Sequence, residues 1–185
     1  SVTELLARIK RASPFLSGIA VSGGECSLQS KSLIELFSLL HQETDLTAFV
    51  DSNGLLDDAE FDALNAATDA FCLDLKAFDE KLHHSLTGCS NLQVKRNIAA
   101  AAKAAKLYEV RTVLVEGYTD STQEISELGN WLSVLPGDFR WKLIPFRSQG
   151  VRGELNRKAP FSAERYRTLG ETARKILGER VITTN

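Results

Sequence analysis

The sequence lacks several features that would place it in an obvious class. It contains no methionine, four prolines, and three cysteines that are widely spaced along 185 residues. An odd and scattered set of cysteines argues against a disulfide framework and for a reducing compartment, so we expect a cytoplasmic protein. No apolar run approaches the length of a membrane span, and no signal peptide is visible. The net charge of −2 gives no general reason to expect nucleic acid or a membrane as a partner.

The composition is that of an ordinary globular protein, with 43% hydrophobic and 25% charged residues. A chain of this length can bury a sizeable core, so we expect residues 1–185 to form a single domain. The chain starts at Ser1 and opens directly in a helix pattern, without a leading strand. Together with the missing methionine, this leads us to expect a piece of a longer protein.

Charge is unevenly distributed along the chain. Ten acidic residues and one basic residue lie between Asp45 and Glu80, whereas eleven Lys and Arg face five acids from Asp138 onward. Solvated helix faces are the simplest explanation. The alternative is that the basic end meets an anionic ligand or an acidic partner.

Helix and strand patterns alternate along the chain. Apolar residues at helical spacing predict helices over residues 1–12, 28–41, 57–67, 79–86, 92–107, 121–134 and 162–177. The last but one begins with Ser121 and Glu124, which predict a capping box. Short apolar runs predict strands over residues 16–22, 46–50, 70–75, 110–115, 139–144 and 181–183. Because no hairpin signal separates them, we expect α/β architecture of mostly parallel strands, five to six of them, in either an incomplete (β/α) barrel or an open sheet.

Residues able to bind a ligand gather where the predicted strands end. They are Ser22-Gly23-Gly24-Glu25, Asp51 to Gly54, Asp74 with Lys76, Arg111 on its strand, and Arg147. The carboxyl ends of parallel strands meet on one face, which is where barrel proteins carry their sites. Glycine lets a ligand approach the backbone, since it has no Cβ. The sequence therefore predicts a ligand site at this face.

The same motifs carry a resemblance to a known family. They are Ser22-Gly23-Gly24-Glu25, Asp51-Ser52-Asn53-Gly54, Cys72 to Lys76, Leu86-Thr87-Gly88, and Arg111 with Glu116-Gly117-Tyr118-Thr119-Asp120. In this order and spacing, over about residues 15–153, the chain resembles the radical S-adenosylmethionine activating enzymes of glycyl radical enzymes, such as those that activate pyruvate formate-lyase. The segment with Phe146, Arg147 and residues 150–153 looks most like an uncharacterised branch of that family.

The resemblance implies a fold, a reaction and the participants in that reaction. The fold is a partial (β/α) barrel of mostly parallel strands, with five to six strands present and the first strand missing. S-adenosylmethionine and a [4Fe–4S] cluster would be the cofactors, and reductive cleavage would give a radical that removes hydrogen from a backbone glycine of a partner enzyme. The implied partners are a glycyl radical enzyme as protein substrate and a flavodoxin- or ferredoxin-type electron donor. Neither nucleic acid nor a membrane is expected.

The resemblance also assigns roles to residues. Gly23 and Gly24 would offer backbone carbonyls to the methionine amino group, with Glu25 supporting that strand end. Lys76 would pair with the methionine carboxylate, as a compact cation suited to it. The remaining cofactor-binding residues would be Asp51, Asn53, Asp74, Arg111 and Arg147. Of these, Asp51 and Asp74 resemble the carboxylates around a monovalent-cation site. Arg147 stands at the position where the best-studied member of the family has a histidine that contacts the cofactor.

The chain departs from the family at the cluster. The defining Cys-x3-Cys-x2-Cys motif, whose thiolates hold the iron, is absent, and Cys26, Cys72 and Cys89 are too far apart to replace it. We expect that motif upstream of Ser1, Cys26 as a neutral packing thiol, and residues 1–185 alone to bind no cluster, contain no catalytic residue and be inactive. Two alternatives stay open: an activating enzyme of anaerobic ribonucleotide reductase, and a non-catalytic domain that binds a partner or a nucleotide.

Overall fold

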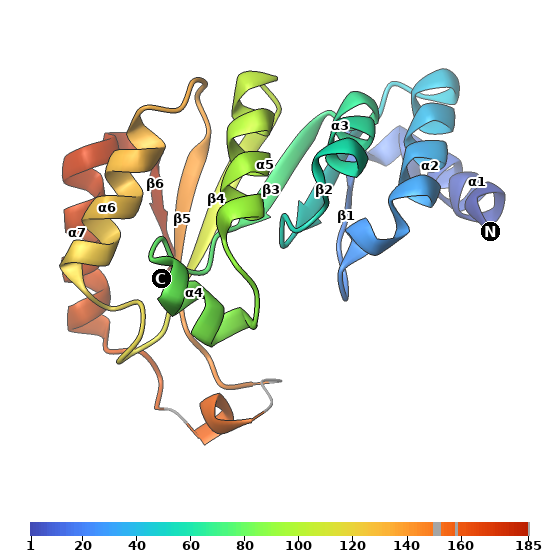
Figure 1. Ribbon diagram of the computed structural model, residues 1–185. Helices are drawn as coiled ribbons and strands as arrows, with labels where there is room; N and C mark the ends of the chain where they lie inside the picture. Colours follow the sequence, from blue (N-terminus) through green and yellow to red (C-terminus); the bar gives the residue numbers. More distant parts are fainter. Residues whose placement is uncertain (150–152, 158, 185) are drawn as a thin grey trace. The chain divides into compact units, whose positions relative to one another are not determined.

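The computed structural model describes residues 1–149, 153–157 and 159–184 (Figure 1). The chain divides into two compact units. Unit 1 comprises Ser1–Asp74 and Gln93–Tyr108, and unit 2 comprises Leu75–Leu92 and Glu109–Asn185. The single domain expected from the sequence stays a prediction.

The strands follow one another in the sheet in the order of the chain, from β1 to β6. Every described strand pair is parallel. Sequential parallel strands with intervening helices are the connectivity of (β/α) barrels, whereas a doubly wound sheet reverses its strand order at a switch point. Within the described residues β1 and β6 are the two edge strands, so the sheet is not closed. The expected α/β class with the connectivity of a partial barrel is therefore confirmed.

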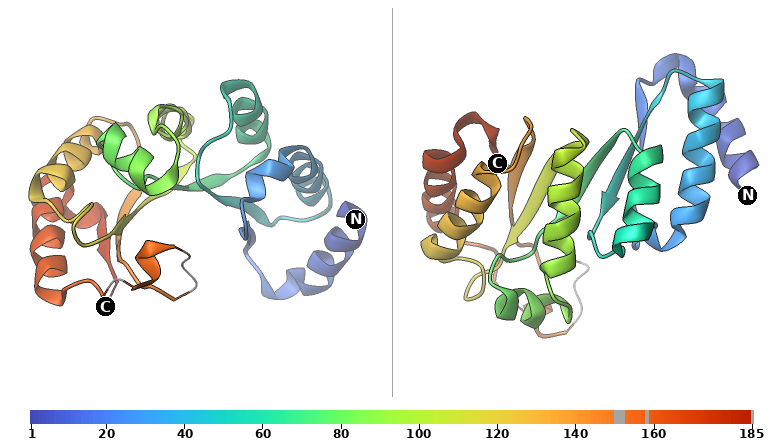
Figure 2. Two further views of the ribbon diagram at one scale, coloured as in Figure 1. Left: turned by 60° about the horizontal axis from the view of Figure 1, so that its bottom comes forward. Right: turned by 45° about the horizontal axis from the view of Figure 1, so that its top comes forward.

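Unit 1 contains the first half of the alternation. Its elements are α1 (Val2–Ala12), β1 (Gly18–Val21), α2 (Ser30–Glu43), β2 (Thr47–Ser52), α3 (Asp58–Ala67), β3 (Ala70–Asp74) and most of α5 (Leu92–Lys103), with short 3-10 turns η1 (Ser13–Phe15) and η2 (Cys26–Gln29). Figure 2 shows α2, α3 and α5 on the same face of the strands. The core on that face is apolar and fully buried, with Phe37, Leu40, Val50 and Ile98 at its centre.

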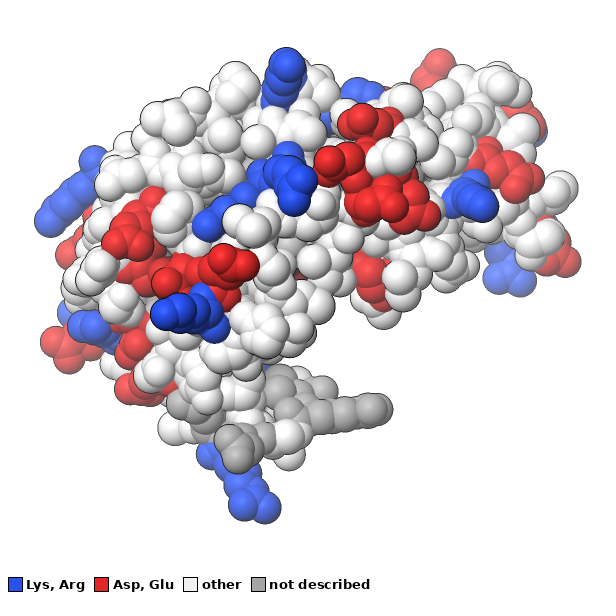
Figure 3. Space-filling model, viewed as in Figure 1, with Lys and Arg blue, Asp and Glu red and all other residues white. Residues whose placement is uncertain are grey.

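Charged side chains cover the outer surface of these helices. Figure 3 shows the acidic side chains of α3 next to basic side chains of α5. Asp58 accepts a hydrogen bond from Gln93 Nε2 at 2.7 Å and lies 3.8 Å from Arg96 Nη1. Because both charges are exposed, such a pair contributes at most about 1 kcal/mol. In α3, therefore, the acidic stretch of the sequence forms a solvated helix face.

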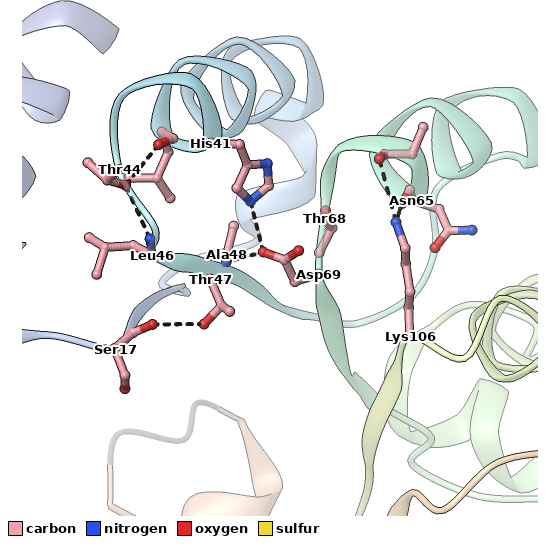
Figure 4. A network of polar contacts seen from close by, with 12 residues as sticks. Ser17, His41, Thr44, Leu46, Thr47, Ala48, Asn65, Thr68, Asp69 and Lys106 are labelled. Atoms are coloured by element: carbon pink, nitrogen blue, oxygen red, sulfur yellow. Dashed lines mark hydrogen bonds and ion pairs between the residues drawn. The ribbon is translucent and has the colours of Figure 1, made fainter.

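The amino ends of the strands in unit 1 are held by a polar network (Figure 4). The carboxylate of Asp69, just before β3, accepts a hydrogen bond from Ala48 N at 2.6 Å and lies 2.8 Å from His41 Nε2. Lys106 Nζ donates to the backbone oxygen of Asn65 at 2.6 Å. This end of a parallel sheet stabilises the fold, whereas ligands bind at the opposite end.

Unit 2 contains the second half. Its elements are α4 (Glu80–Thr87), β4 (Leu107–Leu114), α6 (Thr122–Ser133), β5 (Arg140–Pro145), η3 (Glu154–Arg157), α7 (Ala163–Leu177), η4 (Gly178–Arg180) and β6 (Val181–Thr183), of which β4 begins in unit 1. Trp141 is fully buried, and its indole N–H donates to Thr112 Oγ1 at 3.1 Å. The Tyr166 hydroxyl donates to Leu143 O at 2.7 Å, which fixes α7 against β5.

Some predicted boundaries are wrong. Strand β2 runs to Ser52, so Asp51 and Ser52 lie in the strand and not in the following turn. The helix predicted to reach residue 107 ends at Lys103, and β4 begins at Leu107. The alanine-rich sequence gives no stop signal, but Ala105 adopts a left-handed φ of 57° that ends the helix. The basic loop predicted after β5 falls partly on residues 150–152, outside the described residues.

None of the helices within the described residues combines the length and the apolar composition that a membrane crossing requires.

Candidate functional site

The turn after β1 contains two glycines that the backbone requires. Gly23 has φ of 99° and Gly24 has φ of 53°, in the region where a side chain is strained by about 1–2 kcal/mol. A Cβ built on either residue would meet no described atom within 4 Å. The space beside this backbone is therefore open, as the approach of a ligand to main-chain groups requires.

Glu25 fixes this turn to the end of the neighbouring strand. Its carboxylate accepts hydrogen bonds from Ser52 Oγ at 2.8 Å, Asn53 N at 2.9 Å and Ser27 N at 3.1 Å. Ser52 Oγ in turn accepts from Gly54 N at 3.1 Å. The ends of β1 and β2 thus share one carboxylate, which is the supporting role expected for Glu25.

These contacts determine the pKa of Glu25. Burial is the largest single influence and raises the pKa, but the hydrogen bonds from Asn53, Ser27 and Ser52 together outweigh it. The pKa of Glu25 therefore lies below its ordinary value of 4.5. The ionised carboxylate is the form that the turn requires, since every contact made to it comes from a donor.

Two further predicted residues of unit 1 lie on adjacent strands. Asp51 on β2 is in register with Cys72 on β3, and Asp74 lies two residues beyond Cys72. Because side chains alternate along a strand, Asp51, Cys72 and Asp74 belong to the same face of the sheet. This placement suits the monovalent-cation site suggested by the sequence, which stays a prediction. The side chain of Asn53 accepts a hydrogen bond from Leu55 N at 3.0 Å within its own turn.

Cys26 follows the turn and is buried against the strand ends. Its thiol donates to the backbone oxygens of Asp51 at 3.2 Å and Val21 at 3.5 Å. Burial raises the pKa of the Cys26 thiol, and the charge of Glu25 raises it further. Cys26 is therefore a neutral packing thiol, as expected.

Unit 2 contains a pocket of about 630 Å³ at the carboxyl ends of its strands. It is bounded by the ends of β4 and β5, the end of α4, η3 and the residue after β6. The side chains that line it include Lys76, Lys142, Arg147, Val113, Ile144 and Phe146. Of the described residues that line it, three are basic and none is acidic.

Two of the three basic residues predicted for the site line the pocket of unit 2, and the third, Arg111, is not among its lining residues. Lys76 and Arg147 line the pocket of unit 2 together. Arg111 is half-buried on β4, and its Nε donates to Glu109 Oε1 at 2.6 Å. The guanidinium charge of Arg111 is thus partly neutralised within the protein.

The segment that carries Lys76 is held by two buried side chains. Glu124 accepts hydrogen bonds from Phe78 N and from Asp79 N, the second at 3.2 Å. Asn91 Nδ2 donates to Ala77 O at 3.0 Å and Phe78 O at 2.8 Å. Four backbone groups directly after Lys76 are therefore satisfied by side chains from elsewhere in unit 2.

This role of Glu124 corrects the predicted capping box. Ser121 does cap α6 by accepting from Glu124 N at 3.1 Å, but the Glu124 carboxylate serves Phe78 and Asp79. Burial raises the pKa of Glu124, and the negative charges of Asp79 and Glu127 raise it further. The hydrogen bonds from the N–H groups of Phe78 and Asp79 lower the pKa. The net pKa of Glu124 is above 4.5. A tertiary contact thus replaces the local one.

The predicted site residues fall into two groups, one in each unit. Unit 1 holds Gly23, Gly24, Glu25, Asp51, Asn53 and Asp74, and unit 2 holds Lys76, Arg111 and Arg147. Sequence reasoning missed Asn91 and Glu124 as supports of the segment after Lys76, and Lys142 as a residue that lines the pocket. Lys142 had a signal, since it is a lone lysine between the apolar residues Trp141 and Leu143.

The described residues fit one implied cofactor and not the other. They contain no group of three His, Cys, Asp or Glu side chains that could hold a metal ion. Cys26 and Cys72 are buried and Cys89 is exposed, on separate elements. A [4Fe–4S] cluster therefore has no set of ligands here. The open glycine turn, in contrast, suits a ligand with a polar group such as the methionine end of S-adenosylmethionine.

The sequential parallel strands, with a glycine turn at the first strand end, define a fold of the (β/α)-barrel type. The model of the Radical SAM superfamily matches residues 1–129, and the chain belongs to this superfamily. A pyruvate formate-lyase-activating enzyme of Streptococcus mutans is 33% identical over 138 residues, which cover 72% of this chain and 52% of that protein. One of Staphylococcus epidermidis is 28% identical over 173 residues, which cover 89% and 69%. The chain thus spans about half the length of the first of these relatives.

Solved structures show the same fold. A domain of pyruvate-formate lyase-activating enzyme from Bacteroides vulgatus superposes with a TM-score of 0.73 at 22% identity, covering 91% of this chain and 99% of that one. SuiB of Streptococcus suis, bound to S-adenosylmethionine, superposes with a TM-score of 0.77 at 16% identity and covers 100% and 43%. At these identities the likeness concerns the fold alone.

Proposed function

We propose that the protein carrying this chain activates a glycyl radical enzyme by reductive cleavage of S-adenosylmethionine and hydrogen abstraction from a backbone glycine. The observation that carries the proposal is the open Gly23-Gly24 turn, braced by Glu25, in a member of the radical SAM superfamily. The names of the relatives from Streptococcus mutans and Staphylococcus epidermidis support the choice of reaction. The protein is then an oxidoreductase whose substrate is another protein.

In this proposal the site residues expected from the sequence bind the cofactor. The backbone carbonyls of Gly23 and Gly24 accept from the methionine amino group, and Glu25 holds them in place. Lys76 pairs with the methionine carboxylate, as a compact cation suited to it. Asn53, Arg111 and Arg147 complete the cofactor site, while Asp51 and Asp74 hold a monovalent cation.

We infer that the cluster ligands lie outside these 185 residues, because the described cysteines do not form a set. The cluster would supply the electron for cleavage when bound, and a flavodoxin- or ferredoxin-type protein would reduce it. What this chain contributes is the binding and orientation of S-adenosylmethionine and the exclusion of water from it.

The test uses the protein expressed from its complete gene and reconstituted with iron and sulfide without oxygen. With dithionite and S-adenosylmethionine, it should form 5′-deoxyadenosine, measured by chromatography, and generate a glycyl radical on pyruvate formate-lyase, measured by electron paramagnetic resonance. Lys76→Met should lower 5′-deoxyadenosine formation about tenfold or more, since a charge-assisted contact is lost. Lys175→Met, at an exposed position of α7, is the matched control.

The outcomes separate the alternatives. A reconstituted protein that forms no 5′-deoxyadenosine would favour the non-catalytic binding domain and refute the proposal. If S-adenosylmethionine is cleaved and the glycyl radical appears on anaerobic ribonucleotide reductase but not on pyruvate formate-lyase, the protein is an activating enzyme of anaerobic ribonucleotide reductase.

A further inference from the structure

The unit 2 pocket contains a lysine that neither the sequence motifs nor the proposed cofactor site uses. Lys142 and Ile144 are half-buried on β5 and line the pocket, whereas Trp141 and Leu143 between and beside them are fully buried. This alternation places the Lys142 side chain on the pocket face of the sheet. The neighbouring walls are apolar, with Val113, Ile144 and Phe146 among them.

The charge of Lys142 is uncompensated within the described residues. Its register partner on β4 is Arg111, which lies beside the buried carboxylate of Glu109. No described residue forms a hydrogen bond or an ion pair with Lys142. Placing an ammonium group against apolar walls is costly unless an anion accompanies it. A negative group on the ligand would compensate this charge.

The surroundings favour a carboxylate over a phosphate. The pocket is bounded on one side by Leu86 and Thr87, at the carboxyl end of α4, where the helix dipole is negative. A dianion is disfavoured there, and Arg147, the arginine of the pocket whose fork would suit a phosphate, is assigned to the cofactor in the proposed function. A single carboxylate on a short apolar stem suits one lysine among apolar walls.

We propose that Lys142 is a specificity-determining residue that binds the carboxylate of an aspartate or glutamate side chain near the reacting glycine of the partner protein. The inference rests on the proposed function for the nature of the partner, a protein segment that presents a glycine. Lys76 remains assigned to the cofactor, and Lys142 selects the substrate. The basic residues from Asp138 onward would then meet an acidic partner, which is one of the two explanations that the sequence allows for them.

The experiment offers the reconstituted full-length protein a pool of blocked nonapeptides, N-acetylated and C-amidated, with glycine fixed at the centre and other positions randomised. Bound peptides are eluted and sequenced by mass spectrometry, and the ratio of Asp to Asn is compared with that of the input. Asp and Asn have the same shape, so the ratio reports charge. The wild-type protein should enrich Asp over Asn about tenfold, as one charge-assisted contact allows.

The variants make the test specific to Lys142. Lys142→Gln should bring the ratio close to that of the input, whereas Lys142→Arg should keep most of the enrichment. Lys175→Gln, exposed on α7, should behave like the wild type. An unchanged ratio in Lys142→Gln, or a wild-type pool that matches the input, would overturn the proposal.

The same preparations separate this proposal from the proposed function. Uncoupled formation of 5′-deoxyadenosine, without peptide, should stay within about twofold of wild type in Lys142→Gln. Loss of that reaction in the variant would assign Lys142 to the cofactor and overturn the proposal. Selection of acidic peptides by a protein that never cleaves S-adenosylmethionine would refute the proposed function and leave the specificity of Lys142 intact.

Discussion

The carboxylate of Glu25 accepts a hydrogen bond of 2.8 Å from the hydroxyl of Ser52, which joins the turn after β1 to the end of β2. Glu124 has a similar role in unit 2, where it accepts from the backbone N–H groups of Phe78 and Asp79 beyond Lys76. Their pKa values move in opposite directions, because hydrogen bonds prevail at Glu25 and burial prevails at Glu124. The two carboxylates therefore give the protein opposite dependences of stability on pH.

Glu25→Gln should lower the free energy of unfolding by about 1–2 kcal/mol at about pH 7, because one acceptor oxygen becomes an amide NH2 that faces a donor. In the wild type the pKa of folded Glu25 lies below 4.5. Its stabilisation is therefore present above the unfolded pKa and is lost as the pH falls through the folded pKa. Urea denaturation followed by far-ultraviolet circular dichroism, between about pH 3 and pH 7, measures both effects.

The control for this prediction is Glu35→Gln, at an exposed position of α2. It should change the free energy of unfolding by less than about 0.5 kcal/mol. If Glu25→Gln has the same free energy of unfolding as Glu35→Gln and retains the loss of stability in acid, the hydrogen bonds of Glu25 between the ends of β1 and β2 do not contribute to stability.

Glu124→Gln should show the opposite pH dependence. The pKa of folded Glu124 is above 4.5, so the favourable contribution of the carboxyl group is present below the unfolded pKa and is lost as the pH rises through the folded pKa. The stability of Glu124→Gln relative to wild type should therefore increase with pH over that window. Glu124→Ala should lose about 2–4 kcal/mol, because the N–H groups of Phe78 and Asp79 lose their acceptor.

The same denaturation series checks this prediction, with Glu171→Gln on the exposed face of α7 as the matched control. A relative stability of Glu124→Gln that falls as the pH rises would contradict the assignment of burial as the dominant influence on Glu124.

The fold was predictable from the sequence because its strands are short apolar runs that no hairpin signal connects. The predicted boundaries that are wrong depend on tertiary contacts. The helix before β4 ends where Ala105 adopts a left-handed φ, and no residue type at that point of the sequence predicts such a conformation. The Gly23-Gly24-Glu25 turn was visible as a motif, but Ser52 lies 27 residues from Glu25 and no local pattern links them. Glu124 matched a capping box, yet its carboxylate satisfies N–H groups 45 and 46 residues away.

Gly24→Ala should separate the backbone requirement at the turn from ligand binding. Gly24 at φ 53° and Gly178 at φ 57° both have no described atom within 4 Å of an added Cβ. Alanine at Gly24 should therefore cost about 1–2 kcal/mol of stability through backbone strain alone, and alanine at Gly178 up to about 3 kcal/mol, because its ψ of −132° lies in a region nearly confined to glycine. Only Gly24→Ala should also weaken binding of S-adenosylmethionine to the reconstituted full-length protein, measured by equilibrium dialysis. Equal affinities for the two variants would exclude the turn from the cofactor site.

Residues 1–185 on their own should bind S-adenosylmethionine weakly or not at all. The described part of the chain provides backbone acceptors at Gly23 and Gly24 and a cation at Lys76, but no set of ligands for the cluster that would anchor the amino and carboxylate groups. Each remaining polar contact exchanges for contacts with water and contributes only about 0.5–1.5 kcal/mol, or about 1.5–3 kcal/mol where a charge takes part. Their sum is small against the cost of fixing a flexible ligand, so titration calorimetry should give a Kd weaker than about 1 mM. Micromolar binding would show that the strand ends alone hold the cofactor, and the cluster would then be needed for the electron but not for affinity.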